Sequence, residues 1–209
     1  MKRSLSFLFA LLLAGSVQAQ FGIKAGLNMA VLDGSNINAD TKYKTQYHAG
    51  AFYEYKIAGP LSLQPELLYS VQGTERKSDV EDYDTKLQYL NLPILVKLTA
   101  GPVFVEAGPQ FGLLMTAKEA GTLLLTPPTP TSPAQYGKVS KQVDDQYKKG
   151  DFSLCAGLGV KVSSLLIGAR FNAGLNDIND AKSVAGVNDP KLKNRVFQAY
   201  LGYQIGGHN

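Results

Sequence analysis

Two glutamates, Glu66 and Glu106, are the residues whose type and placement first suggest chemistry. Both fall in stretches where apolar and other residues alternate, and a facing pair of carboxylates is what glycoside hydrolysis uses. The stretch between them places Lys97 on the same face. Interleaved cations keep both carboxylates ionised, whereas a glycosidase needs one of them protonated. We therefore interpret this face as an ion-pair network that neutralises buried charge.

The predicted network contains eight charged residues that share the glycine-bearing face of their stretches. Each lies within about six residues of a short turn or of the start of the first strand, so the network should gather at one end of the enclosed space. Arg170 and Glu106 should lie at similar height and meet, with Glu66 as a second partner for Arg170. The eight members are Lys24, Glu54, Lys56, Glu66, Lys97, Glu106, Lys161 and Arg170.

A second constellation centres on His48, the only histidine within a strand pattern. Ser70 and Ser153 fall on the same face at similar height, and a histidine beside a serine forms a nucleophilic centre when a carboxylate orients it. No carboxylate on that face lies near them, so an ordinary interior histidine is the better interpretation. Two histidines and one cysteine, far apart, do not make a metal site, and we predict neither a metal nor a cofactor.

The elements that position these residues are strands. In the hairpin over 89–114, residues such as Val103 and Val105 share an apolar face, while Glu106, Gly108 and Gln110 share the other, because strand side chains alternate. The whole chain has about eight such strands, each roughly 10–14 residues long, which suits a tilted strand that crosses a membrane. The connections between them alternate between long and short, as in barrels with short periplasmic turns and longer external loops.

Glycine decides which face is inside. The glycines of these stretches fall on the charged face, where a water-exposed surface has no steric need of them and where they weaken a strand. The crowded interior of an eight-stranded barrel does need small residues. The charged face is therefore predicted to line the interior and the apolar face to meet lipid. The predicted fold is all-β: an eight-stranded antiparallel up-and-down transmembrane β-barrel with short periplasmic turns and long external loops.

The N-terminus predicts export. Residues 1–19 combine a basic start, an apolar run and a small-residue site ending at Ala19, which is typical of a cleaved Sec signal peptide. Residues 20–209 then form one barrel domain. Without the leader, 21 − 2 = 19 basic residues face 17 acidic ones, so the basicity predicts no nucleic-acid partner. The single cysteine, Cys155, excludes an internal disulfide.

Five segments resemble the PorT-like family of bacterial outer-membrane β-barrels, and the likeness covers nearly all of the mature chain. They are YLNLPILVK at 89–97, AGPQFG at 107–112, AGLGV at 156–160, GARFNAGLNDI at 168–178 and NRVFQ at 194–198. The resemblance implies the barrel and a bacterial outer-membrane location. It implies no particular activity, although one branch of the family serves protein secretion across the outer membrane.

The sequence therefore predicts a monomeric outer-membrane barrel with a plugged, charged lumen and no enzymatic activity. An open diffusion channel is disfavoured because eight strands leave room only for side chains. Its role is predicted to be structural or one of interaction, possible protein partners meeting the external loops, with outer-membrane lipid around it and the barrel-assembly machinery acting during insertion. The alternative is a lipid-modifying enzyme that uses His48. The charged segment 75–84 is predicted to be a loop. The longest connection, 116–149, contains four prolines within 127–133 and cannot bury enough apolar surface to order itself, so it is predicted to be irregular.

Overall fold

The computed structural model describes residues 19–34, 41–77, 81–126, 135–144, 147–179 and 192–205. The predicted leader therefore lies almost wholly outside the described residues. No helix in these ranges is long and apolar enough to cross a membrane. The described strands are β1 (Ala19–Gly34), β2 (Thr41–Ala58), β3 (Leu61–Lys77), β4 (Glu81–Ala100), β5 (Val103–Thr126), β6 (Gln135–Gln142), β7 (Gly150–Val162), β8 (Leu165–Gly174) and β9 (Leu192–Ile205).

Eight of these strands close into an antiparallel barrel, which confirms the predicted fold class. Around the barrel the order is β4, β3, β2, β1, β9, β8, β7 and β5, and β5 pairs with β4 to complete the ring. Tight turns at Gly59–Pro60, Gly101–Pro102 and Ser163–Ser164 join neighbouring strands at one end, as the sequence predicted. Gly59 and Gly101 take positive φ angles of 51° and 58°, a conformation that glycine adopts without steric cost.

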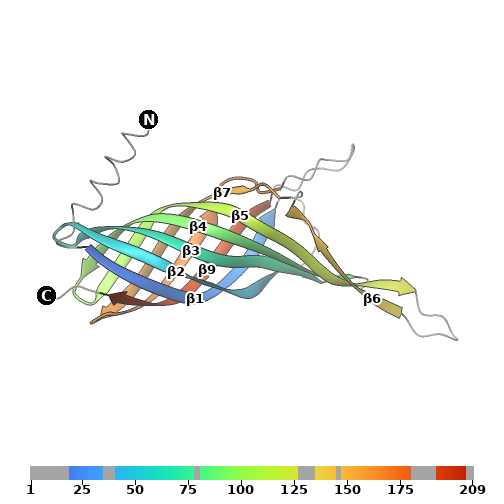
Figure 1. Cartoon of the computed structure of the whole chain (residues 1–209), viewed down its shortest axis with the longest axis horizontal. Helices are drawn as coiled ribbons and strands as arrows, with labels where there is room; N and C mark the ends of the chain where they lie inside the picture. Colours follow the sequence, from blue (N-terminus) through green and yellow to red (C-terminus); the bar gives the residue numbers. More distant parts are fainter. Residues whose placement is uncertain are drawn as a thin grey trace.

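The strand β6 is an addition that the sequence did not predict. It pairs with the outer part of β5, from Lys118↔Gln142 to Thr126↔Gln135, beyond the ring. Figure 1 shows β6 projecting from the end of the barrel opposite the tight turns. The predicted irregular connection over 116–149 is therefore wrong for 116–126 and 135–142, which are strand. Backbone hydrogen bonds order a strand pair without the apolar burial on which that prediction depended.

A second prediction also fails at this end. The charged segment over 75–84 was expected to be a loop, but β3 continues to Lys77 and β4 begins at Glu81, with pairing as far as Lys77↔Asp82. We call the paired parts of β3, β4, β5 and β6 beyond the ring the external extension, over residues 74–77, 81–86, 117–126 and 135–142. Outside the membrane an outward strand face need not be apolar, so polar residues occur on both faces and the alternation signal is lost.

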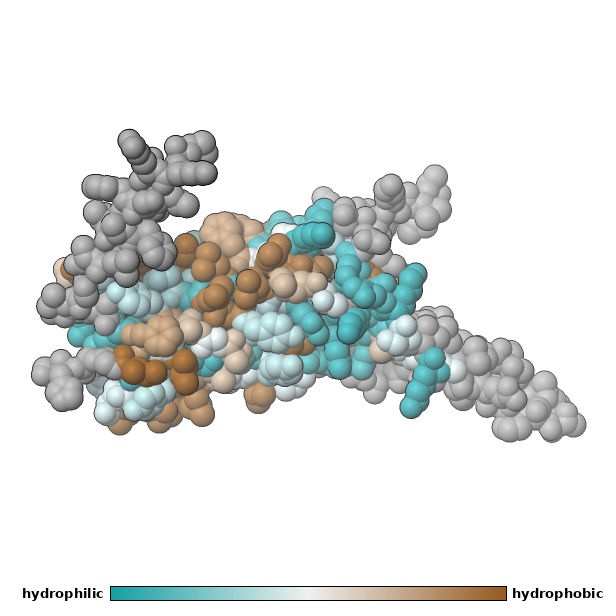
Figure 2. Space-filling view, in the orientation of Figure 1, coloured by the Kyte–Doolittle hydropathy of each residue, from teal (hydrophilic) through white to brown (hydrophobic). Residues whose placement is uncertain are grey.

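Within the barrel, alternate side chains point to the lipid-facing side and to the interior. On β9, Leu201 is 56% exposed while its neighbour Tyr200 is 4% exposed. Exposed large apolar side chains recur at alternate positions on all eight barrel strands. Figure 2 shows brown apolar residues gathered over the barrel and teal hydrophilic residues toward the β6 end. The outer surface is thus an apolar band with a polar external end.

Three interior aromatic rings lie on glycines of the adjacent strand. The cross-strand pairs are Gly22↔Phe52, Phe104↔Gly159 and Gly168↔Tyr200. A Cβ added at any of these glycines would overlap the ring of its partner. Phe52, Phe104 and Tyr200 pack with Leu166 into one buried apolar cluster, which we call the aromatic layer. The glycines are therefore required by the space that the rings occupy, as the predicted crowded interior implies.

A second buried cluster closes the external end of the barrel. Val143 and Tyr147, which follow β6, and Ile178, which follows β8, pack on interior side chains of the barrel strands that include Leu87 and Tyr89. Backbone hydrogen bonds join Val143 N–H to the Ala117 carbonyl and Lys148 N–H to the Ile178 carbonyl. We call the residues Val143, Tyr147 and Ile178 the external cap. Ile178 has no exposed surface, so the cap is packed as a protein core is.

Candidate functional site

Arg170 lies at the centre of the barrel interior and holds two carboxylates at once. Its Nη1 and Nη2 donate to the two oxygens of Glu66, each at 2.8 Å, and its Nε and Nη2 donate to Glu106 Oε1 at 2.8 and 2.6 Å. The predicted contact between Arg170 and Glu106 is confirmed, as is the second one to Glu66. Lys24 Nζ adds a 2.9 Å ion pair to Glu66 and lies 3.7 Å from the centre of the Tyr200 ring.

A second ion pair lies nearer the tight turns. Lys97 Nζ donates to Glu54 Oε2 at 2.9 Å, and Gln204 Nε2 donates to the same oxygen at 3.1 Å. Gln64 joins this pair to the first group, because its Nε2 donates to Glu66 Oε1 at 2.7 Å while its Oε1 accepts from Lys97 at 3.2 Å. We call the six charged residues of these two groups the charge cluster. Three cations balance three carboxylates in it: Lys24, Lys97, Arg170, Glu54, Glu66 and Glu106.

The structure leaves the remaining two predicted members, Lys56 and Lys161, outside this cluster. Lys56 is exposed, two residues from the end of β2, so its prediction as a network residue is wrong. The register of β2 on β3 is irregular between Lys56 and Ala58, and residues 55–60 around the tight turn are exposed. Lys161 is half-buried, and its Nζ donates to the Gln20 side chain at 3.3 Å. The sequence assigned both lysines to the network because they lie close to a tight turn. So close to the turn, however, their side chains are not enclosed by the barrel.

The position of Arg170 also shows how the two carboxylates of Glu66 and Glu106 are used. Arg170 touches both Glu66 and Glu106, so its guanidinium fills the space between them that a sugar would have to enter. Tyr200 Oη donates to the same Glu106 oxygen at 2.9 Å. The pair is thus arranged as two acceptors around one cation, as the sequence interpretation expected.

His48 belongs to a separate polar group in which Asn28 is the central residue. His48 Nδ1 lies 2.7 Å from Asn28 Oδ1, and Gln198 Nε2 donates to the same oxygen at 2.9 Å. Asn28 Nδ2 donates to the carbonyls of Tyr47 and Val71, which fixes its amide orientation and makes His48 Nδ1 the donor.

Ser70 meets this polar group through Asn28, whose Nδ2 donates to Ser70 Oγ at 3.0 Å. His48 Nε2 has no hydrogen-bond partner among the described side chains. A serine nucleophile needs its hydroxyl on the histidine nitrogen. Ser153 is buried on β7 and shares no described hydrogen bond with His48. It bonds instead to the buried carboxylate of Asp151, so the expectation that no carboxylate lies near these serines is wrong. The three predicted residues are therefore not brought into one catalytic arrangement.

A further ion pair, between Lys148 and Asp177, lies beside the external cap. Burial raises the pKa of Asp177, but hydrogen bonds from the backbone N–H groups of Asn179 and Leu192, together with Lys148, outweigh it and hold that pKa below its usual value. These bonds are 3.0 and 2.9 Å long, and the ion pair from Lys148 Nζ is 3.3 Å. Within the described ranges, no group of three His, Cys, Asp or Glu residues is placed to hold a metal ion.

Sequence reasoning missed the uncharged members of both groups. Gln64 and Tyr200 complete the hydrogen bonding of the charge cluster, and Asn28 organises the polar group around His48. All three fall on the predicted interior face. Their polarity at buried strand positions was the available signal, because a buried polar group must find a partner.

Comparison with protein families places the chain clearly. Residues 16–180 match the family model described as "Outer membrane protein beta-barrel domain". No curated protein matches the chain.

Several solved structures are similar in fold, at low sequence identity. The attachment invasion locus protein Ail of Yersinia pestis is 15% identical, with 90% of this chain and 100% of that chain covered and a TM-score of 0.48. Neisserial surface protein A is 14% identical, with 90% and 99% covered and a TM-score of 0.45. OprG of Pseudomonas aeruginosa is 14% identical, with 91% and 97% covered and a TM-score of 0.41.

Proposed function

Because the chain belongs to the outer membrane protein β-barrel domain family and so to the bacterial outer membrane, we propose that it is a closed, non-conducting barrel that presents its external extension to a partner. In this proposal the barrel is a membrane anchor, the interior is a structural plug, and no chemistry takes place at His48. The barrel functions as a monomer surrounded by outer-membrane lipid, after export by a cleaved leader and insertion by the assembly machinery.

Buried side chains along the interior support a closed barrel. The aromatic layer and the charge cluster interleave on the side of the tight turns, where Lys24 lies against Tyr200 and Lys97 against Phe104, and the external cap covers the other end. Arg170, Glu66 and Lys97 are each at most 2% exposed. An ion that crossed would have to separate buried ion pairs, and breaking one such pair costs about 3–5 kcal/mol.

Electrical recording tests the closed interior. The purified protein, inserted in a planar lipid bilayer, should give no conductance steps under an applied voltage. A hollowed variant with Phe52→Ala, Phe104→Ala, Tyr200→Ala, Arg170→Ala, Glu66→Ala and Glu106→Ala is the positive control for the assay, provided that it still shifts on gels when boiled. Steps from the unmodified protein, of a size that the hollowed variant shares, would show that the barrel is a channel.

The external extension is the part of the protein best suited to meet a partner. The outer edge of β6 has no strand beside it among the described residues, and an unpaired strand edge accepts an extended peptide from another protein. Lys138 and Lys141 of β6 are exposed, which favours an acidic peptide. A role in protein secretion, which one branch of the PorT-like family serves, would be one form of such an interaction.

The outer part of β5 and β6 can be removed from the extension without touching the barrel. Replacing residues 122–138 by Asn-Gly joins β5 to β6 through a two-residue turn beside the pair Gly121↔Val139. The shortened protein should keep its boiling-dependent gel shift and lose binding to a partner isolated by crosslinking to the intact protein on cells. Equal crosslinking of both proteins would place the interaction elsewhere.

A further inference from the structure

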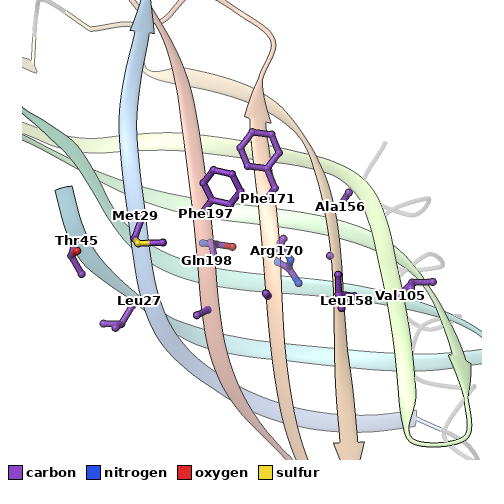
Figure 3. A pocket seen from close by; sticks show the side chains of 13 residues that line it. Leu27, Met29, Thr45, Val105, Ala156, Leu158, Arg170, Phe171, Phe197 and Gln198 are labelled. Carbon is purple, nitrogen blue, oxygen red and sulfur yellow. The ribbon is translucent and has the colours of Figure 1, made fainter. Parts of the chain in front are cut away.

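The lipid-facing surface of the barrel contains a hollow of about 670 Å³ over β1, β9, β8 and β7, with Thr45 of β2 and Val105 of β5 at its two ends. Its walls are outward side chains, with Leu27 at one side, Leu158 at the other, and Phe171 and Phe197 along one edge (Figure 3). Arg170 also contributes to the lining, but its guanidinium is turned into the interior and held by Glu66 and Glu106. The hollow is therefore an apolar depression in the outer wall, separate from the charge cluster.

Two alanines on adjacent strands create the depression. Ala169 of β8 pairs directly with Ala199 of β9, and the next positions along the same row are Leu158 on β7 and Leu27 on β1. Two short side chains thus lie between two long ones. The neighbouring row carries Phe171 opposite Phe197, whose ring centres are 4.5 Å apart. The floor is low because alanine side chains end at Cβ, and longer side chains stand around it on three sides.

The hollow lies near the middle of the membrane. Ala169 is four residues beyond Leu165, where β8 leaves its tight turn. A strand rise of about 3.3 Å per residue and a tilt of about 40° place Ala169 roughly 10 Å above that end. The apolar band of an outer-membrane barrel is about 25 Å tall. At this depth a lipid presents hydrocarbon, and neither head groups nor soluble proteins reach the site.

We infer that this hollow is a binding site for the acyl chain of a membrane phospholipid, held longer than the lipids around the rest of the barrel. The hollow is continuous with the lipid-facing band, and its depth selects hydrocarbon. A second copy of the chain fits the site less well. The hollow is lined by 13 residues, against about 20–30 on each side of a stable protein interface.

Native mass spectrometry after removal of loosely bound lipid tests the site. The unmodified protein should retain one phospholipid, and Ala169→Leu with Ala199→Leu, which fills the hollow, should lower the retained fraction at least tenfold. Ala25→Leu with Ala49→Leu is the matched control, because these alanines are also exposed and cross-strand paired but do not line the hollow. This control should retain lipid as the unmodified protein does. Equal retention by all three proteins, or by none, would overturn the inference.

A second measurement does not depend on the filled variant. The chain has no tryptophan, so Phe197→Trp places a single reporter at the rim, and Phe111→Trp places one on an outward position of β5 away from the hollow. When brominated phosphatidylcholine is added to protein purified with plain phosphatidylcholine, quenching should develop more slowly for Phe197→Trp than for Phe111→Trp, because a retained chain exchanges slowly. Identical quenching rates contradict a retained chain. Dimers that appear in the unmodified protein and vanish only in the filled variant would instead assign the surface to a second copy.

Discussion

The guanidinium of Arg170 and the carboxylate of Glu66 form two parallel hydrogen bonds of 2.8 Å each between β8 and β3. In the ring order these two strands are four places apart in either direction, so the pair spans the full width of the barrel. A bidentate contact of this kind fixes both distance and orientation. It therefore links opposite walls that share no backbone hydrogen bond.

Removing Arg170 should destabilise the barrel strongly. Arg170→Ala leaves Glu106 with Tyr200 as its remaining described hydrogen-bond partner, while Glu66 keeps Lys24 and Gln64. An uncompensated buried charge costs about 3–5 kcal/mol. Urea midpoints in detergent should fall accordingly for Arg170→Ala and stay near the parent value for the exposed Lys86→Ala.

The same contacts predict which second substitution restores stability to the Arg170→Ala variant. Glu106→Gln in the Arg170→Ala background should recover more stability than Glu66→Gln, because Glu106 has lost its only cation in the cluster. Strict additivity of Arg170→Ala and Glu106→Gln in the urea midpoints would mean that the two side chains do not interact.

The aromatic layer predicts a steric effect. Gly168→Ala places a methyl group in the space of the Tyr200 ring, and overpacking of this kind costs about 1–3 kcal/mol. Gly150→Ala is the matched control, because an added Cβ there meets no atom within 4 Å. Thermal unfolding in detergent should separate the two, and Tyr200→Leu should largely abolish the effect of Gly168→Ala.

The external cap should loosen in acid. The pKa of Asp177 is held below its ordinary value, so its charge stabilises the fold above that value and the contribution is lost as the pH falls through the folded-state pKa. The amide proton shifts of Asn179 and Leu192, followed by NMR in detergent, should titrate with a midpoint below the ordinary value of about 3.9. Asp177→Asn should remove this titration. A midpoint at or above 3.9 would contradict the hydrogen-bonded carboxylate.

Disulfide trapping tests the pairing of β6 with β5. In a Cys155→Ser background, Glu119→Cys with Lys141→Cys should form a disulfide, because these residues are directly paired and Cα atoms about 4.4–6.8 Å apart suit the bond. Glu119→Cys with Lys138→Cys is off register by three residues and should stay reduced. Equal oxidation of both variants would show that the connection has no fixed register.

A substitution at His48 distinguishes the proposed membrane anchor from the alternative, a lipid-modifying enzyme. His48→Asn should leave the acyl composition of the lipids unchanged in cells that express the protein, since Ser70 is bonded to Asn28 and not to the histidine. Lipid mass spectrometry compares the variant with the parent and with cells that lack the protein. An acyl change that requires His48 would establish the enzyme.

Alternation in the sequence identifies which side chains face the interior but not which ones meet there. Lys97 is paired across strands with Glu106, yet its amine bonds Glu54, and Arg170 reaches Glu66 on the far wall. Such contacts depend on the stagger of the strands around the ring. The stagger includes register shifts, as between Gln88 and Tyr89, that leave no mark in the composition. Polar strands outside the membrane, such as β6, show no alternation at all.

The position of Arg170 late in the chain has a consequence for the order in which the barrel is completed. The first five strands carry three carboxylates of the charge cluster, Glu54, Glu66 and Glu106, but only two of its cations, Lys24 and Lys97. A chain that has been delivered only as far as β7 therefore holds one unmatched negative charge within the cluster. Arrival of β8 supplies the missing cation, so electrical neutrality of the cluster coincides with the step just before the last strand closes the ring.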